Sequence, residues 1–224
     1  MSEKILFNFA TRSRPEKFFK CLENIYINSK SSNFEVLIKI DIDDTTMNKA
    51  SVLDKICRYK GTRVVAGKSN NKIHAINRGL KLVDGWDILI NTSDDMWFTE
   101  YGFDTIIRDD FREKFPEGDG FLHYNDGFQG ENVSTMSIMD KKYYDRFGYI
   151  YHPSYVSLWC DNEAMEVAKK LGRHKYMGDK QLFQHKHPAW GFEEWDAQYA
   201  KTEDLGVNEQ DKNNYLARKN NGFT

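Results

Sequence analysis

The first hundred residues alternate between apolar strand-like runs and amphipathic helical segments, and this order most constrains the fold. Segments 5–10 and 36–40 are typical of strands, and the apolar segment 86–90 is typical of a buried strand. Helical spacing of apolar residues separates them. A strand–helix–strand order predicts a mostly parallel sheet with helices on both faces. Right-handed crossovers in such a sheet bring the carboxyl ends of its strands to one edge, where ligands bind.

Each of these strand-like segments ends in a polar cluster. Segments 11–14, 41–44 and 91–95 carry hydroxyl, carboxylate, amide and guanidinium side chains directly after the apolar runs. Because the carboxyl ends of parallel strands share an edge, we expect the three clusters to meet there. The sequence therefore predicts a polar site at that edge.

The second half of the chain has a less regular pattern, with a Gly-rich loop near residues 118–130. The charged segment 192–224 is predicted to be a peripheral helix with a fraying end. Further helices are predicted at 16–28, 49–59, 71–82, 141–147 and 161–171, and further strands at 62–65, 121–124, 133–139 and 181–185.

Composition narrows the class of protein. The 224 residues are 40% hydrophobic and carry a formal net charge of −2, which suits one α/β domain and gives no general reason to expect nucleic acid or a membrane as partner. The start of the chain lacks the pattern of a signal peptide, and no apolar run is long enough to span a membrane. Three cysteines lie far apart without metal-ligand spacing, so a reducing, cytoplasmic setting is expected.

The pair Asp94-Asp95, after Ser93, is the first candidate for chemistry. Two adjacent carboxylates repel each other unless a cation or a hydrogen-bond donor compensates. Mg²⁺ and Mn²⁺ prefer oxygen ligands, typically one or two carboxylates plus phosphate. Taken alone, such a pair is more often a solvated turn or a helix cap.

Charged residues in the other two clusters complement this pair. A carboxylate of Asp41, Asp43 or Asp44 could accept hydrogen bonds from a nucleobase or a ribose hydroxyl, or could cap a surface loop. Arg12, Arg14, Lys68 and Lys72 are candidates to neutralise a pyrophosphate, although each alone could be an ordinary surface cation. Neither a Walker motif nor a GxGxxG after the first strand is present, which argues against a P-loop NTPase or a dinucleotide enzyme.

The later segments add acids and histidines. Asp161 and Glu163 open a predicted helix, where they could stabilise its first turn or place a general base near a cleft. His185 and His187 alternate along a predicted strand, so they could point to the same side and one of them could bind a metal ion.

Together, these motifs resemble those of the GT-A fold glycosyltransferases, in particular family-two-like enzymes and their compact phage and bacterial members. The resemblance runs over residues 5–191 and rests on the segments 9–15, 72–79 and Ser93-Asp94-Asp95. It implies a single GT-A (Rossmann-like) domain. Residues 1–100 would form the nucleotide-sugar-binding half, 101–191 the acceptor and catalytic half with a small acceptor-side subregion, and 192–224 a peripheral tail.

The resemblance also implies roles for individual residues. Asp161, with Glu163 beside it, stands where inverting members carry the catalytic base. Cys160 stands where many members have an acid, and the first acid of a full DxD motif is replaced by Thr92 or Ser93. The metal ligands implied are Asp95 and His187 or His185, and the donor-binding residues implied are Thr11, Arg12, Arg14, Asp43, Asp44, Lys72, Asn77 and Asp94.

The function implied is metal-dependent transfer of a sugar from a nucleotide-sugar, with a UDP-sugar favoured, to an acceptor hydroxyl, and inversion of configuration is expected. The cofactor expected is Mn²⁺ or Mg²⁺. A glycan, a small molecule or a modified nucleobase in DNA remain open as acceptors, as does the oligomeric state. Two alternatives stay open: a nucleotidyltransferase acting on a sugar phosphate, and a non-catalytic nucleotide-sugar-binding module.

Overall fold

The computed structural model describes residues 2–192 and 194–224. Its strands are β1 (Ile5–Thr11), β2 (Phe34–Asp41), β3 (Thr62–Gly67), β4 (Ile88–Thr92), β5 (Met96–Phe98), β6 (Phe121–Tyr124), β7 (Ile138–Asp140), β8 (His174–Met177) and β9 (Phe183–His185). Its α-helices are α1 (Pro15–Asn28), α2 (Ala50–Ile56), α3 (Lys72–Asn77), α4 (Phe103–Lys114), α5 (Lys141–Asp145), α6 (Cys160–Lys170), α7 (Ala197–Thr202) and α8 (Leu205–Asn220), with short 3₁₀ turns η1 (Leu80–Leu82) and η2 (Pro188–Trp190).

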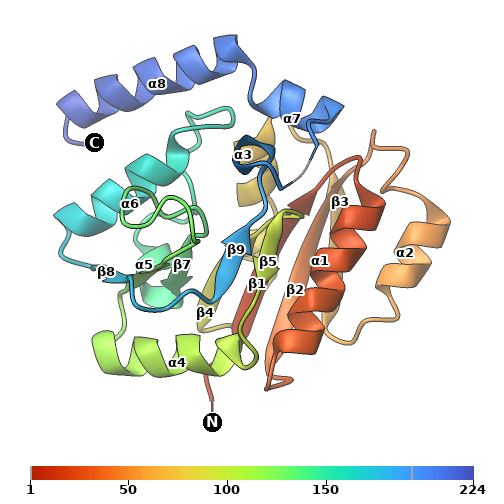
Figure 1. Cartoon of the computed structure of the whole chain (residues 1–224), viewed down its shortest axis with the longest axis horizontal. Coiled ribbons are helices and arrows are strands. Elements are labelled where there is room, and N and C mark those ends of the chain that lie inside the picture. The colour runs from red at the N-terminus through yellow and green to blue at the C-terminus, as the bar shows by residue number, and fades with distance from the viewer. Residues whose placement is uncertain (1, 193) are drawn as a thin grey trace.

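A seven-stranded sheet in the order β3-β2-β1-β4-β7-β6-β8 forms the centre of the molecule (Figure 1). The first four strands are parallel to one another, and β6 is parallel to β8. Only β7 runs antiparallel to its neighbours β4 and β6. The predicted α/β fold with a mostly parallel sheet is therefore confirmed.

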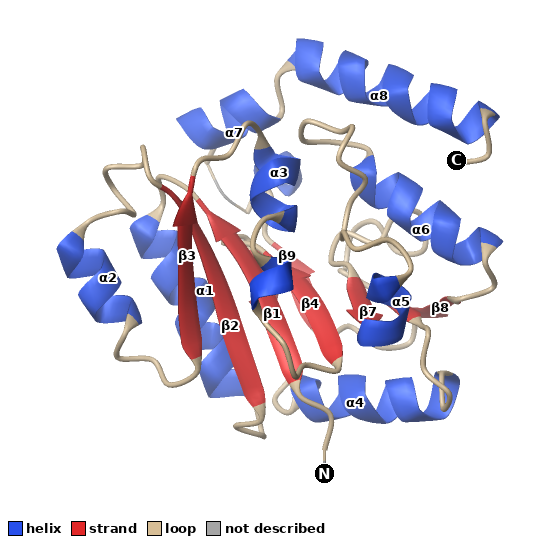
Figure 2. Cartoon of the chain, turned by 180° about the vertical axis from the view of Figure 1, so that it is seen from behind, coloured by secondary structure: helices blue, strands red, loops and turns tan. Residues whose placement is uncertain are grey.

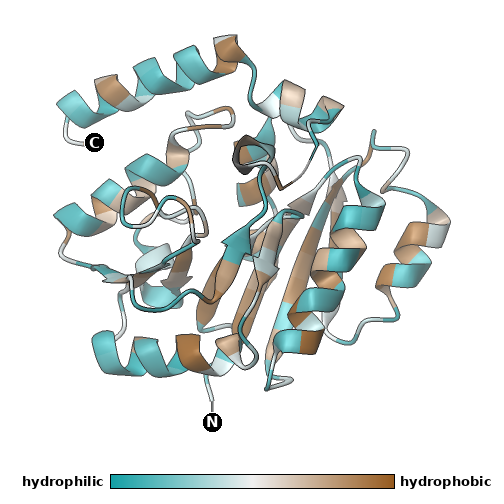
Figure 3. Cartoon of the chain, in the orientation of Figure 1, coloured by the Kyte–Doolittle hydropathy of each residue, from teal (hydrophilic) through white to brown (hydrophobic). Residues whose placement is uncertain are grey.

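Both faces of the sheet are covered by helices because side chains alternate along each strand. In β1, Phe7 packs into one core with Phe18 of α1 and Phe103 of α4. Leu6 packs into the opposite core with Ile76 of α3. Figure 1 shows α1 on one face, and Figure 2, from behind, shows α3 and α5 on the other. Apolar residues are concentrated in the strands of the sheet, whereas hydrophilic and hydrophobic residues alternate along the helices (Figure 3).

The strands end where the polar clusters begin. Thr11, Asp41 and Thr92 are the last residues of β1, β2 and β4. The register pairs Phe9 with Thr92 and Asp41 with Gly67, so these ends lie side by side. The prediction that the three clusters share one edge of the sheet is confirmed.

Some elements differ from the sequence-based expectation. The helix expected at 71–82 is divided, because Gly79 adopts a left-handed conformation (φ 78°) between α3 and η1. The strand expected at 133–139 is confined to β7. Helix α4 has no counterpart among the predicted elements.

The segment predicted as a peripheral tail packs against the body. Tyr199 of α7 and Tyr215 of α8 are buried, and α7 lies beside the carboxyl ends of β1 to β3 (Figure 2). The difference arises because two aromatic side chains in an otherwise charged segment find tertiary partners that no local pattern reveals. Within the part of the chain that the structure describes, no helix combines the length and apolar character needed to cross a membrane.

Candidate active site

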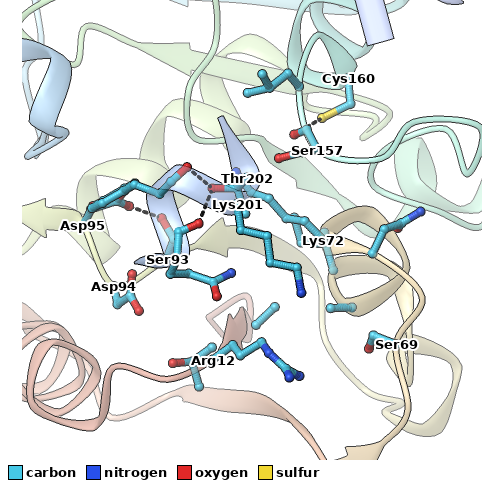
Figure 4. Close-up of a pocket in the computed structure, with 18 of the residues that line it drawn as sticks. Arg12, Ser69, Lys72, Ser93, Asp94, Asp95, Ser157, Cys160, Lys201 and Thr202 are labelled. Atoms are coloured by element: carbon cyan, nitrogen blue, oxygen red, sulfur yellow. Dashed lines mark hydrogen bonds between the residues drawn. The ribbon is translucent and has the colours of Figure 1, made fainter. Parts of the chain in front are cut away.

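A cavity of about 470 Å³ opens at the carboxyl edge of the parallel strands. Its walls come from the ends of β1, β2 and β4, from α3, from the loop before α6, from β9 and from α7. Figure 4 shows Asp94 and Asp95 on one side of this pocket, Ser69 and Lys72 on the other, and Arg12 near its base. The cavity brings together ten of the sequence-predicted site residues: Thr11, Arg12, Arg14, Asp43, Lys72, Asp94, Asp95, Asp161, His185 and His187.

Three predicted site residues do not line the cavity and instead hold local structure. Asp44 accepts hydrogen bonds from the backbone of Ser13 and from Thr46. Asn77 bonds the backbone of residues 150–151. Glu163 accepts a hydrogen bond from the Tyr155 hydroxyl at 2.7 Å and pairs with both Nε and Nη2 of Arg218.

Asp95 and His185 meet at the cavity wall because their strands pair. Strand β5 runs antiparallel to β9, and their register sets Met96 opposite His185. The Lys186 amide donates to the Asp95 carbonyl at 2.8 Å, which continues the pairing by one residue. As a result, His185 Nε2 lies 3.4 Å from Asp95 Oδ2. Ser93 donates a further hydrogen bond to Asp95 Oδ1.

The chemistry of this pair fits a divalent cation. One carboxylate oxygen and one imidazole nitrogen suit Mn²⁺, and their 3.4 Å separation compares with a spacing of roughly 3 Å between adjacent ligands of an octahedral ion. Within residues 2–192 and 194–224, no group of three or more His, Cys, Asp or Glu side chains is arranged to hold a metal. Further ligands would therefore have to come from substrate phosphates and water.

His187 is oriented differently from His185. Its Nδ1 accepts a hydrogen bond from the Ala189 amide at 3.2 Å, and its Nε2 lies 3.6 Å from Glu203 Oε1. Both ring nitrogens are thus engaged. By contrast, His185 Nδ1 is buried without a hydrogen-bond partner among the described residues, and its Nε2 faces Asp95. Of the two predicted histidine ligands, His185 has the better geometry.

The adjacent acids Asp94 and Asp95 differ in their electrostatics. Burial and the charge of Asp95 raise the pKa of Asp94 to about 6, against the opposing effect of Arg14. Burial also favours the neutral form of Asp95, but hydrogen bonds from His185 and Ser93 and the charge of Lys72 outweigh it and hold the pKa of Asp95 well below its usual range. Asp95 is therefore ready to bind a cation near neutral pH.

Arg14 is held between two acids. Its Nη1 lies 3.1 Å from Asp94 Oδ1, and its Nη2 lies 2.6 Å from Asp196 Oδ1. The guanidinium carbon stacks 3.7 Å from the centre of the Tyr199 ring. These contacts join the turn before α1 to the acidic pair and to the C-terminal segment, so Arg14 holds these three parts of the site together.

A second ionic group lies at the ends of β1 and β2. Arg12 Nη1 is 2.9 Å from both Asp41 Oδ2 and Asp43 Oδ1. The hydrogen bond from Arg12 lowers the pKa of Asp43 to about 2. The other oxygen of Asp41 lies 3.4 Å from Arg78 Nη1. Among the described residues, the hydroxyls of Thr11 and Ser69 are buried without a hydrogen-bond partner. This corner thus offers polar groups that a ligand could satisfy.

Asp161 occupies the first turn of α6 and lines the cavity. Its Oδ1 accepts a hydrogen bond from the Asn162 amide at 2.9 Å. Burial raises the pKa of Asp161, and that hydrogen bond and the positive charge of Lys72 only partly offset the effect. A carboxylate with a raised pKa is a stronger base, which suits proton abstraction.

Several residues of the cavity were not predicted from the sequence. Tyr199, Lys201 and Glu203 reach the cavity from α7 and its end, and Ser157 comes from the loop before α6. Figure 4 shows the side chains of Lys72 and Lys201 extending into the pocket. The spacing of Tyr199 from Asp196 and Glu203 is helical and could have indicated a common face, but not what that face contacts.

Comparisons with known proteins bear on the fold. Neither a family model nor a curated protein sequence matches the chain. Among solved structures, it is similar to the mannosyltransferase PcManGT from Pyrobaculum calidifontis in complex with GDP-Man and Mn²⁺, with a TM-score of 0.65 and 14% identity over 85% of this chain and 60% of that one.

It is also similar to S. aureus TarS 1-349 in complex with UDP-GlcNAc, with a TM-score of 0.59 and 15% identity over 81% of this chain and 58% of that one. The chain thus spans at most 60% of either structure. Likeness at this level of identity shows a shared architecture. The chain has the GT-A-type fold of these glycosyltransferase structures, as the sequence resemblance predicted.

Proposed function

We propose that this protein is a metal-dependent glycosyltransferase that moves a sugar from a nucleotide-sugar donor to an acceptor hydroxyl. One observation carries the proposal: Asp95 Oδ2 and His185 Nε2 converge at 3.4 Å in the same cavity that Asp161 lines. A cation site and a basic carboxylate in one cavity are what a displacement at an anomeric carbon needs.

The donor would lie along the strand ends. Its nucleoside would occupy the corner formed by Arg12, Asp41 and Asp43, where the Thr11 hydroxyl is buried without a hydrogen-bond partner among the described residues. Its diphosphate would extend toward Lys72 and Lys201, which supply positive charge within the cavity. PcManGT is complexed with GDP-Man and TarS with UDP-GlcNAc, so both purine and pyrimidine donors belong in the test. A UDP-sugar remains the first choice.

The ion proposed is Mn²⁺ or Mg²⁺, held by Asp95 and His185. When bound, it would stabilise the negative charge that develops on the nucleoside diphosphate as it leaves. The support is the donor set of one carboxylate oxygen and one imidazole nitrogen, together with the Mn²⁺ in the PcManGT complex. Asp94 would contribute by holding Arg14, through the 3.1 Å ion pair.

Asp161 is proposed as the general base. It would take the proton of the acceptor hydroxyl while the acceptor oxygen forms a bond to the anomeric carbon. The bond from that carbon to the diphosphate oxygen breaks, and its electron pair leaves with the nucleoside diphosphate. A single displacement of this kind inverts the configuration. The raised pKa of Asp161 and its position in the cavity wall support this role over Glu163, which is engaged by Arg218.

Release of nucleoside diphosphate from a panel of nucleotide-sugars tests the proposal without a known acceptor. Incubation of the protein with UDP-glucose, UDP-GlcNAc and GDP-mannose, with Mn²⁺, is expected to give slow hydrolysis of one donor, with water as the acceptor. Asp161→Asn is expected to reduce this rate by about 10²–10⁴-fold. Glu163→Gln, compared at equal folded fraction, should reduce it far less.

The products separate the alternatives. A nucleotidyltransferase would release pyrophosphate from a nucleoside triphosphate and leave the panel untouched. A binding module would bind one nucleotide-sugar but leave it intact. Either result would overturn the proposed transfer activity.

A further inference from the structure

One face of α8 contacts the loop that precedes α6. Asn208, Asp211 and Tyr215 are spaced by three and four residues, so they lie on the same side of the helix. Asn208 Oδ1 accepts a hydrogen bond from the Trp159 indole at 2.8 Å, and the Tyr215 ring lies 5.3 Å from that of Trp159. Asp211 lies between them and is fully buried.

Asp211 binds backbone amides of this loop. Its Oδ1 accepts from the amide of Val156 at 2.9 Å, and its Oδ2 accepts from those of Ser157 and Leu158 at 2.8 Å each. Three successive amides point at one carboxylate only if the backbone curls around it. Hydrogen bonds to a charged acceptor are stronger than those between neutral groups, and because these are buried, water screens them little.

The residues held in this way form part of the cavity wall. Val156, Ser157 and Leu158 line the cavity, and the Val156 carbonyl accepts a hydrogen bond from the Ile73 amide at 3.4 Å, next to Lys72. The loop therefore joins the C-terminal helix to the first turn of α3.

The loop also sets the start of α6. Trp159 has a left-handed backbone (φ 62°), which is unfavourable for a bulky residue and persists only where its surroundings impose it. The helix begins at the next residue, Cys160, and places Asp161 in its first turn. The direction of the Asp161 side chain thus depends on the backbone of residues 156–159.

We propose that Asp211 is a positioning residue for Asp161, a role that rests on the proposed function of Asp161 as the base. Through the three amides, Asp211 fixes the loop and hence the carboxylate of Asp161 in the cavity. A displacement of about 1 Å at a reacting group can cost on the order of 10²-fold in rate. Loss of Asp211 would therefore act on turnover rather than on donor binding.

A neighbouring ion pair provides a matched control. Arg218, two turns further along α8, pairs with the buried carboxylate of Glu163 at 2.8 Å and also anchors α8 to α6. It does not bind the loop amides. Arg218→Gln should therefore loosen the anchoring of the helix while the backbone of residues 156–158 stays in place.

The experiment compares Asp211→Asn with Arg218→Gln, and exposure of the buried Cys160 thiol is followed by thiol labelling. Both variants carry Cys57→Ser, because the exposed thiol of Cys57 would also react with the label. An Asn side chain keeps the shape of Asp211 but replaces one acceptor oxygen with a donor. In Asp211→Asn, kcat for donor hydrolysis is expected to fall by about 10- to 100-fold with the donor KM changed by less than about twofold. Labelling of Cys160 by N-ethylmaleimide should become about tenfold faster as the loop opens. In Arg218→Gln, both kcat and the slow rate of Cys160 labelling should stay near the values of the parent protein.

The outcomes are distinct. Unchanged Cys160 labelling in a folded Asp211→Asn variant would overturn the proposal whatever the activity. Faster labelling with unchanged kcat would also overturn it, as would equal losses of kcat in Asp211→Asn and Arg218→Gln. If the parent protein hydrolyses no nucleotide-sugar, the proposed function fails, and the labelling comparison alone decides whether Asp211 fixes the loop.

Discussion

The Tyr199 hydroxyl donates a hydrogen bond to Asp95 Oδ2 at 3.1 Å, and the same carboxylate oxygen lies 3.4 Å from His185 Nε2. The phenol reaches this oxygen from α7, 104 residues away in the sequence. The guanidinium carbon of Arg14 lies over the Tyr199 ring, 3.7 Å from its centre. Helix α7 therefore helps to orient the carboxylate proposed to bind the metal ion.

Tyr199→Phe removes this hydrogen bond and keeps the aromatic packing. We expect Mn²⁺-dependent nucleotide binding to weaken by about 3- to 10-fold, because a partner that orients a metal ligand contributes on the order of 1 kcal/mol. Titration calorimetry with a nucleoside diphosphate, with and without Mn²⁺, measures the effect. Tyr215→Phe, which removes a hydroxyl bonded to Glu166 away from the cavity, is the matched control.

Equal affinities in Tyr199→Phe and the parent protein would show that the tyrosine does not support the metal site. An equal loss in Tyr215→Phe would assign the effect to general loosening of the C-terminal helices.

The pH dependence of turnover tests the role of Asp161. A base must be deprotonated to act, so the rate falls as pH drops through its pKa. Because burial raises the pKa of Asp161, the acidic limb of the kcat profile is expected above the usual range for an aspartate, which is near 3.9. Measuring kcat for donor hydrolysis from pH 4 to pH 8 determines the pH at which this acidic limb falls. A limb at or below the ordinary aspartate range would contradict the assignment.

The pair His123 and His174 predicts a loss of stability in acid. His123 is buried, and its Nδ1 lies 3.3 Å from His174 Nε2. Burial lowers the pKa of each to about 4, and His123 adds to the effect at His174. Between pH 4 and 6.5 the unfolded chain binds more protons than the folded one, so the free energy of unfolding falls as pH is lowered through this window.

Replacing His123 by Phe removes one of these groups and keeps an aromatic ring. The loss of stability between pH 6.5 and pH 4 is expected to shrink by up to about 3 kcal/mol relative to the parent. Urea denaturation at several pH values measures it, and the difference at pH 7.5 gives the cost of repacking alone. Parallel pH profiles for the two proteins would contradict the prediction.

The sheet and its polar edge could be predicted because the pattern that encodes them is local. Strands β1, β2 and β4 are apolar and buried, and the polar residues that follow them mark where each strand ends. Pro15 likewise begins α1 as expected. In these segments a residue's own type and its neighbours decide its environment.

Helix α4 was not predicted, although Phe103, Ile107 and Phe111 recur with helical spacing. Asp104, Arg108 and Asp110 are also buried within it, which obscures the boundary between its polar and apolar faces. Asp104 and Arg108 pair with each other at 2.6 Å, Lys180 pairs with Asp110, and further partners come from distant segments. Asp104 accepts the amides of Lys30 and Ser31, and Asp110 accepts the Tyr124 hydroxyl. The contribution of α7 to the cavity was hidden for the same reason, since the partners of Tyr199 are far away in sequence.

The metal-bridged donor site is tested most directly by thermal unfolding of the parent protein and of Asp95→Ala with nucleoside diphosphates and nucleotide-sugars, with and without Mn²⁺. A ligand that binds only the folded state at 100 times its Kd stabilises it by about 2.7 kcal/mol, which gives a clear shift. The expected result is a shift with one nucleotide that requires Mn²⁺ and is lost in Asp95→Ala. Absence of a shift with every nucleotide, or a shift that is the same in Asp95→Ala, would contradict the proposed site.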